Sequence, residues 1–176
     1  MHLQTFTGRF VHPAQPSAED IDIRDIAHAL SLQCRFGGHA KCAYSVAQHS
    51  YLASKIVPPA DALWALLHDA SEAYLVDVPT PVKRLAAMDG YRALEAQMQR
   101  LIFQTFGLRG EMPESVKEAD EALVLAEADV LLASGAGRDF DEIRARVAPA
   151  TIRIIPVVAA QAERVFLRRF HELTER

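Results

Sequence analysis

The sequence predicts an all-α fold, a single-domain helical bundle. Apolar residues recur at helical spacing over several long segments, and prolines and glycines mostly mark the ends of these segments. Few runs alternate apolar and polar residues as a half-buried strand would, the best being residues 151–157. A chain of 176 residues is long enough to bury one hydrophobic core. We therefore expect helices packed around a common core.

Residues 1–38 are expected to hold an extended or weakly stranded lead-in followed by the first helix. Ser17 and Asp20 form a capping box, in which each residue satisfies a backbone donor of the other. Apolar residues then follow at positions 23, 26, 27 and 30, the i, i+3, i+4, i+7 spacing of one helix face. Gly37 and Gly38 end this helix or the turn just after it.

Two further helices are expected to precede a proline-rich loop. The first covers residues 44–56 and is stopped by Pro58 and Pro59. The second covers residues 60–74, with apolar positions 63, 66, 67 and 70 as its core stripe. Residues 76–83 contain two prolines two positions apart, each of which restricts the residue before it. We expect a stiff loop there.

Three helices are expected in the remainder of the chain. Residues 89–106 form an amphipathic helix that ends at Gly107. Residues 113–134 form another, with a proline in its first turn and Val116, Ala119, Leu123 and Val130 facing inward. Residues 158–173 form the last helix. No internal repeat or linker is evident, so residues 1–176 read as one domain.

The composition excludes several classes of protein. Lysine and arginine number 19 against 23 acidic residues, a formal net charge of −4. Domains that bind long nucleic acids are usually basic, so we expect no nucleic acid polymer as a partner. No apolar run approaches the ~20 residues of a membrane span, and the N-terminus lacks a signal-peptide core. Two cysteines, Cys34 and Cys42, cannot make a disulfide framework. We expect a cytoplasmic protein with no membrane partner.

The most informative segment for chemistry is residues 66–77. On a helix, His68, Asp69 and Glu72 lie close along one side, after a strongly apolar half-helix. An adjacent histidine and aspartate at the end of a buried helix are costly unless a metal ion or a charged partner satisfies them. The alternative is a helix terminus with solvated charges.

Two further residues favour a metal site. His49 lies on the otherwise apolar face of the helix at 44–56, where the alternative is a core histidine with satisfied hydrogen bonds. Asp120 falls on the buried side of its helix, where the alternative is a solvated residue among other acids. With His68 and Asp69 they make a set of two imidazoles and two carboxylates, which suits one divalent transition metal such as Mn²⁺, Co²⁺, Zn²⁺ or Fe²⁺. Helices in a bundle can project such ligands to one central point.

The order of these residues resembles a known family. His49, His68-Asp69 and Asp120 are similar to the H…HD…D signature of the HD-domain metal-dependent phosphohydrolases. The strings YSVAQHS at 44–50, HDASEAY at 68–74 and DVPTPVK at 77–83 resemble the branch that holds bacterial 5′-deoxynucleotidases and phage-encoded deoxynucleotide hydrolases. The resemblance covers about residues 25–130 and implies an HD-type helical bundle.

The resemblance also implies roles for the matching residues. The metal ligands it implies are His49, His68, Asp69 and Asp120. Glu72 becomes the acid or base that handles the nucleophilic water. Asp77 becomes a second functional carboxylate near the sugar or the leaving group.

On the substrate side, Arg35 matches the arginine that these nucleotidases place against the substrate phosphate. Phe36 stands where they have a tryptophan against the base, which leaves the base and sugar preference open. His39 either touches phosphate or caps the turn. Lys83 either adds positive charge or is a solvated lysine.

The resemblance implies a nucleotide phosphohydrolase, and the favoured substrate is a deoxynucleoside 5′-monophosphate. One alternative is a dATP-type deoxynucleoside triphosphate triphosphohydrolase that releases tripolyphosphate. It would need further cations, for which the candidates are Lys41, Lys83, Arg84 and Arg92. Another alternative is a nucleotide-sensing metal module without turnover, against which Glu72 and Asp77 speak. We also expect a homodimer, because the helix at 89–106 has apolar residues to spare, including Leu101, Ile102 and Phe103.

Overall fold

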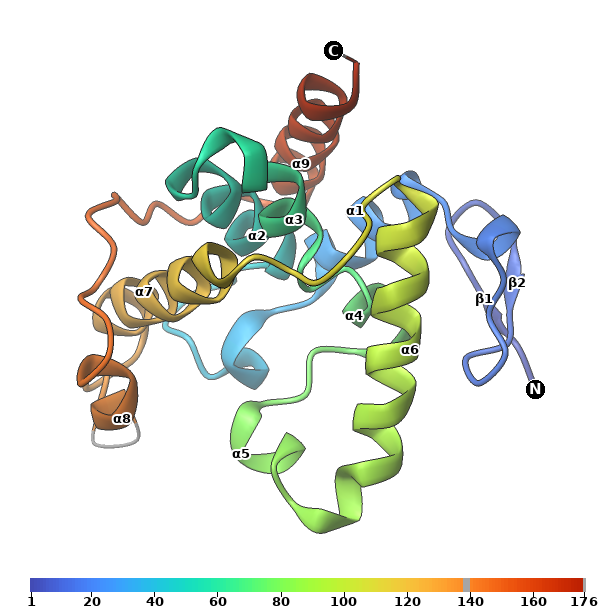
Figure 1. Ribbon diagram of the computed structural model, residues 1–176. Coiled ribbons are helices and arrows are strands. Elements are labelled where there is room, and N and C mark those ends of the chain that lie inside the picture. Colours follow the sequence, from blue (N-terminus) through green and yellow to red (C-terminus); the bar gives the residue numbers. More distant parts are fainter. Residues whose placement is uncertain (138–139, 176) are drawn as a thin grey trace.

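Helices make up most of the structure, a computed structural model that describes residues 1–137 and 140–175 (Figure 1). They are, in chain order, α1 (Ile23–Leu32), α2 (Val46–Ile56), α3 (Ala62–Leu67), α4 (Glu72–Leu75), α5 (Thr80–Lys83), α6 (Asp89–Thr105), α7 (Glu114–Leu131), α8 (Asp141–Arg144) and α9 (Ala159–Thr174). Strands β1 (Leu3–Gln4) and β2 (Phe10–Val11) pair as an antiparallel hairpin ahead of α1. The prediction of a predominantly helical single domain is confirmed. Within the described ranges, no helix combines the length and apolar character that a membrane crossing requires.

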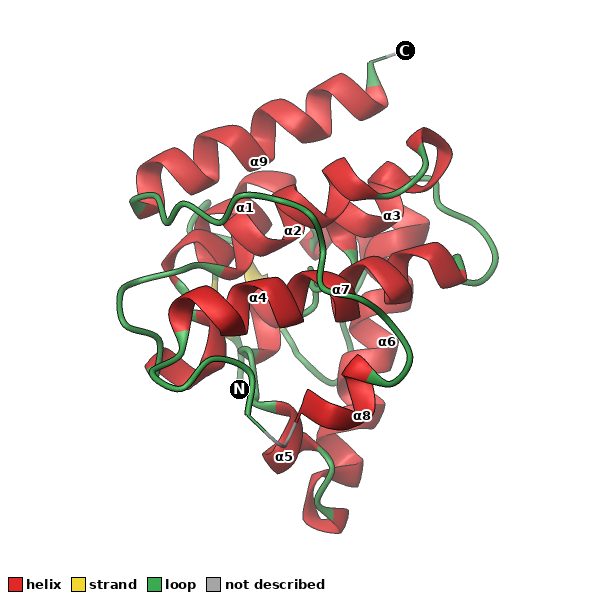
Figure 2. Ribbon diagram, turned by 90° about the vertical axis from the view of Figure 1, so that its left-hand side faces the viewer, coloured by secondary structure: helices red, strands yellow, loops and turns green. Residues whose placement is uncertain are grey.

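Helix α2 lies at the centre of the packing. It contacts α1, α3, α7 and α9, and Figure 2 shows α9 crossing above α1 and α2. The core between these helices and α6 is formed by side chains without solvent exposure, among them Leu30, Leu66, Met98, Ile102 and Phe166. Any side chain that α2 presents to α3 or α7 is therefore held by neighbours on several sides.

A second apolar cluster lies between α2, α3 and α7. Trp64 of α3 is buried there, and its ring packs edge-on against Phe103 of α6 with centroids 4.7 Å apart. Ile102, the neighbour of Phe103, is fully buried in the main core. These apolar residues of α6 are thus used inside the chain, which removes the reason for expecting a homodimer through them. The oligomeric state stays a prediction without support from this helix.

The start of α1 differs from the expectation in a specific way. The capping box forms, with the carboxylate of Asp20 accepting from the backbone N–H of Ser17 at 2.7 Å. It caps the single 3-10 turn Ala18–Asp20 rather than α1. Asp22 is the N-cap of α1, and its side chain accepts from the backbone N–H of Arg24 at 2.9 Å. The box is confirmed, and its assignment to the long helix is wrong.

The helix expected over residues 60–74 is broken by a turn at residues 68–71, between α3 and α4. The side chain of Gln99, from α6, takes the place of helical hydrogen bonds. Its Oε1 accepts from the backbone N–H of Ser71 at 3.0 Å, and its Nε2 donates to the carbonyl of Leu67 at 2.7 Å. A tertiary contact has overridden the helical periodicity, as packing often does.

One other boundary is corrected. Residues 76–83 are not a loop throughout, because α5 occupies Thr80–Lys83 with a proline in its first turn, where no backbone donor is needed. The two glycines end the turn after the first helix, the second of the two alternatives. The helix itself ends at Leu32, and Gly37 and Gly38 close the 3-10 turn Arg35–Gly38 with φ of 58° and 80°.

Candidate metal centre

Histidine and aspartate side chains from three parts of the chain meet beside α2. His49 lies on α2, His68 and Asp69 occupy the turn after α3, and Asp120 lies on α7. Helix α2 contacts both α3 and α7, which brings these residues together although they are far apart in the sequence (Figure 1). His49 has no solvent exposure, whereas the side chain of Asp120 is partly open.

The spacing of the ligand atoms of His49, His68 and Asp69 is compatible with a single ion, and Asp120 lies close to both histidines. His49 Nε2 lies 3.3 Å from His68 Nε2 and 3.0 Å from Asp120 Oδ1. His68 Nε2 lies 3.2 Å from Asp69 Oδ2 and 3.7 Å from Asp120 Oδ1. Metal bonds of about 2.0–2.2 Å place neighbouring ligand atoms about 3.0–3.5 Å apart. Ligand atoms of His49, His68 and Asp69 lie within 4.8 Å of one another, so this His-His-Asp cluster could hold a metal ion.

Hydrogen bonds fix the orientation of both imidazoles. His49 Nδ1 lies 2.8 Å from the carboxylate of Glu127, and His68 Nδ1 lies 2.8 Å from the carbonyl of Ala65. Since an ionised carboxylate and a carbonyl only accept, each Nδ1 carries a hydrogen and donates it. In the neutral rings both Nε2 atoms then present lone pairs to each other, and neither can donate. A cation between them, a proton or a metal ion, satisfies both.

Charges around the cluster attract such a cation. Burial alone would lower the pKa of His68, but Asp69 and Asp120 raise it well above its usual value. Burial alone would raise the pKa of Asp69, but the neighbouring His68 outweighs this and lowers it to about 2. The pKa of Asp120 is lowered well below its ordinary value, against the effect of burial, by its hydrogen bonds to both histidines. Protons and metal ions thus compete for the same two nitrogens.

A fully buried carboxylate that the sequence analysis missed, Glu127 of α7, supports this cluster. Its Oε1 is 2.8 Å from His49 Nδ1 and accepts from Tyr44 Oη at 2.7 Å, and its Oε2 accepts from Arg35 Nε at 3.2 Å. Burial raises the pKa of Glu127, but the charges of His49 and Arg35 bring it below its ordinary value. Metal-binding histidines commonly donate their other N–H to such a carboxylate.

The helical spacing of α7 contained a signal for this residue. Glu127 follows Asp120 by two helical turns and therefore lies on the same face. The expectation that Val130 faces inward is wrong, because Val130 is 49% exposed and the adjacent Leu131 is buried instead. The inward face of α7 thus carries acidic as well as apolar residues.

The residues expected to meet a substrate phosphate and base flank the cluster. Arg35 Nη1 lies 3.4 Å from Asp69 Oδ2, and the guanidinium is largely buried. Phe36 has a φ of 56°, in the left-handed region, and its ring lies 5.7 Å from Arg35 Cζ. His39 is exposed, and its backbone N–H donates to the carbonyl of Phe36 at 3.0 Å, which fits the alternative that it caps the turn.

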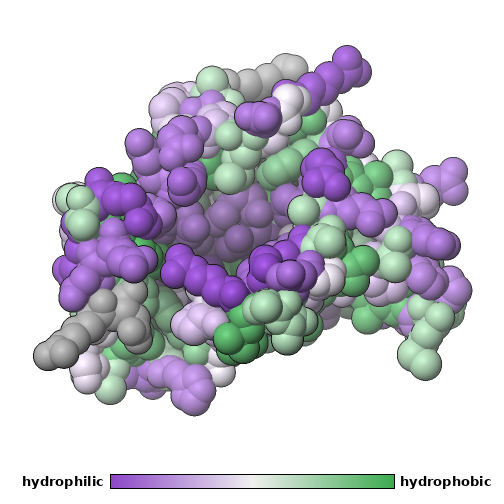
Figure 3. Space-filling view, turned by 60° about the horizontal axis from the view of Figure 1, so that its bottom comes forward, coloured by the Kyte–Doolittle hydropathy of each residue, from purple (hydrophilic) through white to green (hydrophobic). Residues whose placement is uncertain are grey.

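Glu72 and Lys83 line a cavity of about 260 Å³ that also reaches His68 and Asp69. Figure 3 shows hydrophilic side chains gathered in a hollow on the face that carries α5. Glu72 is buried; its Oε1 is 3.6 Å from Lys83 Nζ, and its Oε2 has no hydrogen-bond partner among the described residues. Burial, and then the charges of Asp69 and Asp77, raise the pKa of Glu72 well above its ordinary value. This carboxyl can hold a proton at a pH where an exposed glutamate has lost it.

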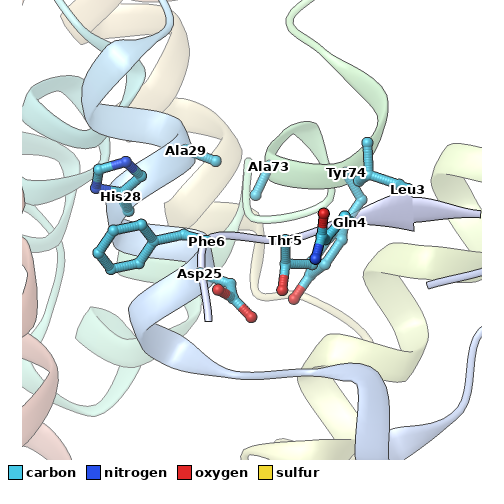
Figure 4. Close-up of a pocket in the computed structure, with 9 residues that line it drawn as sticks. All are labelled: Leu3, Gln4, Thr5, Phe6, Asp25, His28, Ala29, Ala73 and Tyr74. Carbon is cyan, nitrogen blue, oxygen red and sulfur yellow. The ribbon is translucent and has the colours of Figure 1, made fainter. Parts of the chain in front are cut away.

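Another hollow, of about 290 Å³, lies between the N-terminal hairpin and the helices α1 and α4 (Figure 4). Asp25 lines it, but its carboxylate already accepts from the backbone N–H and the Oγ1 of Thr7 at 2.6 Å and 2.8 Å. His28 stacks on Phe6 with ring centroids 3.8 Å apart. These contacts attach the hairpin to α1, and none of the cluster residues lines this hollow.

Among the described residues, three glutamine side chains each bind one backbone N–H and one carbonyl of a segment outside the long helices. We call them the glutamine clamps: Gln33, Gln48 and Gln99. Gln99 holds the turn at 68–71, as described above. Gln48 of α2 donates to the carbonyl of Ile155 at 2.7 Å and accepts from the backbone N–H of Val157 at 3.0 Å. The clamps give irregular segments the hydrogen bonds that a helix or sheet would otherwise supply.

Val76, directly before Asp77, has a strained backbone. Its φ of 70° and ψ of 149° lie in a region that residues other than glycine rarely adopt. Tyr91 Oη donates to the carbonyl of Val76 at 2.6 Å. Strain of this kind costs about 1–3 kcal/mol and is kept only where the surroundings impose it. The direction of the chain at Asp77 therefore depends on contacts made elsewhere.

Replacing Val76 by glycine is expected to raise the free energy of unfolding by about 1 kcal/mol, because glycine adopts this φ without strain. The residue is 60% exposed, so little apolar burial is lost. Urea denaturation measures the change. Val82→Gly is the matched control, since this exposed valine lies in α5, where glycine costs about 1 kcal/mol. Equal losses in both variants would contradict strain at Val76.

The fold and the cluster define a class: a predominantly helical protein whose partly buried His-His-Asp cluster could hold a metal ion. No family model matches the chain. The uncharacterized protein YfdR of Escherichia coli (strain K12) is 37% identical over 173 residues, which cover 98% of this chain and 96% of YfdR. The chain belongs to the YfdR family. The uncharacterized protein RCAP_rcc00048 of Rhodobacter capsulatus is 38% identical over 125 residues, 66% of this chain and 63% of that protein.

Proposed function

We propose that this protein is an HD-type, metal-dependent nucleotide phosphohydrolase that cleaves deoxynucleoside 5′-monophosphates to deoxynucleoside and phosphate. The observation that carries the proposal is the convergence of two imidazole Nε2 atoms and two aspartate oxygens beside a buried glutamate with a raised pKa. The order of these residues in the sequence, which resembles the HD signature, supports the same class.

The cluster residues fit a divalent transition metal. The proposed ligands are His49, His68, Asp69 and Asp120, a nitrogen and oxygen set that suits Mn²⁺, Co²⁺, Zn²⁺ or Fe²⁺. Such an ion, when bound, supplies positive charge against the phosphate and lowers the pKa of water. Glu127 and the carbonyl of Ala65 bind the Nδ1 atoms of the two imidazoles, so both Nε2 atoms would be available to hold the ion. Both the types of ligand atom and the orientation of the two imidazoles are thus suited to a divalent transition metal.

Other residues of the chain supply the remaining parts of the reaction. Glu72 lines the cavity, and burial together with the charges of Asp69 and Asp77 raises its pKa, which suits a group that takes up and returns a proton. Arg35 uses Nε and Nη1 on two carboxylates. Its Nη2 would then be the nitrogen that donates to a phosphate oxygen. Asp77 is proposed as a second functional carboxylate near the sugar or the leaving group. Lys83 holds a positive charge within 3.6 Å of Glu72.

A monophosphate is favoured because most cations that a triphosphate would need are already paired. Lys83 Nζ lies 2.6 Å from Glu95 Oε1, and Lys41 Nζ donates to a backbone carbonyl of α7 at 3.2 Å. Arg92 pairs with Asp89 and donates to the carbonyl of Lys83. Breaking the exposed bonds of Lys41 and Arg92 to bind further phosphates would cost about 0.2–1 kcal/mol each, and the partly buried Lys83–Glu95 pair would cost more. Most of the candidate cations would therefore have to break an existing bond before they could pair with the additional phosphates of a triphosphate.

We expect protein loaded with Mn²⁺, Co²⁺ or Zn²⁺ to release phosphate from deoxynucleoside monophosphates. For the best monophosphate, kcat/KM should exceed that of its triphosphate by about 10-fold or more. Malachite-green detection measures the release, with pyrophosphatase and polyphosphatase added to reveal pyrophosphate and tripolyphosphate. His68→Ala, which removes one Nε2, should lose metal binding and hydrolysis together.

Two outcomes would overturn this proposal. Tripolyphosphate as the main product would identify a triphosphohydrolase. Binding of nucleotide without hydrolysis by protein loaded with each metal would favour the sensing module.

A further inference from the structure

Gln33, the residue after α1, connects three segments that carry the candidate site. Its backbone carbonyl accepts from the N–H of Val46 at 3.1 Å, at the start of α2. Its side-chain Nε2 donates to the carbonyl of Glu72 at 2.9 Å, and its Oε1 accepts from the backbone N–H of Asp77 at 2.9 Å. A single amide group therefore holds the backbone of both carboxylate residues.

The segment around Asp77 depends on this amide because its own structure is weak. Helix α4 is a single turn, and Val76 follows it with the strained φ of 70°. Tyr91 holds the carbonyl of Val76, while the N–H of Asp77 bonds to Gln33. Without the acceptor of Gln33, Val76 can relax to an ordinary φ, and the peptide that carries Asp77 turns with it.

We infer that Gln33 is a positioning residue that fixes Asp77 relative to Glu72. It therefore governs the rate of the chemical step and not the binding of metal. The effect on rate rests on the proposed function. A displacement of about 1 Å in a catalytic constellation can cost about 10²-fold in rate. Within the described part of the chain, no hydrogen bond joins the side chain of Gln33 to the four proposed ligands. Replacing Gln33 should therefore leave the affinity for metal unchanged.

Gln33→Met tests the inference, because methionine has a similar length but neither a donor nor an acceptor amide. Three quantities are measured on the full chain: the exchange rate of the Asp77 amide by NMR, the affinity for Mn²⁺ by calorimetry, and kcat and KM for dAMP with Mn²⁺. We expect exchange at Asp77 to accelerate about 10-fold or more. We expect kcat to fall about 10- to 100-fold, with KM and Mn²⁺ affinity little changed.

Gln48→Met is the matched control. It removes two bonds of the same kind, to Ile155 and Val157, from a clamp that does not touch Glu72 or Asp77. Its thermal stability should fall by an amount similar to that of Gln33→Met. Exchange at Asp77 and kcat should remain at the wild-type values, which separates positioning from a general loss of stability.

Gln33→Glu gives an independent check if the methionine variant fails to fold. A carboxylate still accepts from the N–H of Asp77 but no longer donates to the carbonyl of Glu72, so exchange at Asp77 should stay slow. Unchanged exchange in folded Gln33→Met, or unchanged kcat despite fast exchange, overturns the inference. If the wild-type protein hydrolyses no nucleotide, the proposed function fails, and the exchange data still decide whether Gln33 fixes Asp77.

Discussion

Replacement of Glu72 by glutamine is expected to lower kcat for the best deoxynucleoside monophosphate by about 10²- to 10⁴-fold. Glutamine has nearly the same size, but its amide cannot carry out acid–base proton exchange with substrate or a water nucleophile near neutral pH. The wild-type carboxyl is suited to that exchange, because burial and neighbouring charges raise its pKa well above the ordinary value. Mn²⁺ affinity should change little, since Glu72 is outside the His-His-Asp cluster. Steady-state kinetics and calorimetric titration measure both quantities.

Glu163→Gln is the control for this substitution. Glu163 lies on α9, where its Oε2 is 3.2 Å from His28 Nδ1, and it does not line the cavity beside Glu72. The Glu163→Gln variant should therefore have the same kcat as the wild-type protein. A wild-type kcat in Glu72→Gln would refute the proton-handling role, whereas loss of Mn²⁺ binding in that variant would make Glu72 a ligand instead.

Glu127→Ala is expected to have the largest effect on stability, a loss of about 3–5 kcal/mol. The substitution leaves the guanidinium of Arg35 without one of its two carboxylates and leaves Tyr44 Oη without its acceptor, both in a buried region. His49 also loses the acceptor that orients its ring, so Mn²⁺ should bind about 10- to 100-fold more weakly. Urea denaturation and calorimetric titration measure the two losses.

Glu127→Gln removes the negative charge of the side chain but keeps its size and shape, so it measures the contribution of the charge to stability. Folding lowers the pKa of Glu127 below its ordinary value of 4.5. The ionised carboxylate therefore makes its full contribution to the free energy of unfolding at any pH above 4.5. The contribution is lost as the pH falls through the lower folded value. The stability difference between wild type and Glu127→Gln should therefore shrink as the pH falls below 4.5.

The control for both variants is Glu121→Ala, on the same helix. Its carboxylate pairs with Arg146 at 2.8 Å near the surface, so the substitution should change stability by no more than about 1 kcal/mol. A loss in Glu127→Ala no larger than this would show that the buried carboxylate does not hold its three partners together.

Two of the long helices, α6 and α9, were predicted closely because their signals are local, whereas α7, expected over 113–134, ends at Leu131. Helix α6 was expected over 89–106 and runs over Asp89–Thr105, and α9 was expected over 158–173 and runs over Ala159–Thr174. Apolar spacing, prolines and glycines within a few residues decide where such helices begin and end. Differences of one residue at the ends are within the ordinary fraying of a last turn.

The turn at 68–71 could not be predicted in the same way. Its cause, the side chain of Gln99, lies 28 residues away from Ser71 in the sequence. The local sequence favours a continuous helix there, and the contact that breaks it exists only once α6 has packed against α3. The same holds for the strained φ of Val76, which has no marker such as glycine.

For the candidate site, the order of the proposed ligands could be predicted but their environment could not. A motif contains residues that are expected to touch an ion or a substrate, and the four ligands were proposed from such a motif. Glu127 acts through His49 and stands in an acidic segment, where a glutamate is ordinarily solvated. Only the packing of α7 against α2 shows that this carboxylate is buried.

Transplanting the cluster into another helical scaffold would require more than its ligand side chains. Without Glu127 an engineered histidine could rotate, and without Gln99 the two adjacent ligands would sit on a regular helix with a different spacing. Gln33 would be needed as well, to hold the backbone N–H of Asp77. Designed sites commonly fail because such supporting contacts are left out. The transferable unit is therefore the ligands together with Glu127, Gln33 and Gln99.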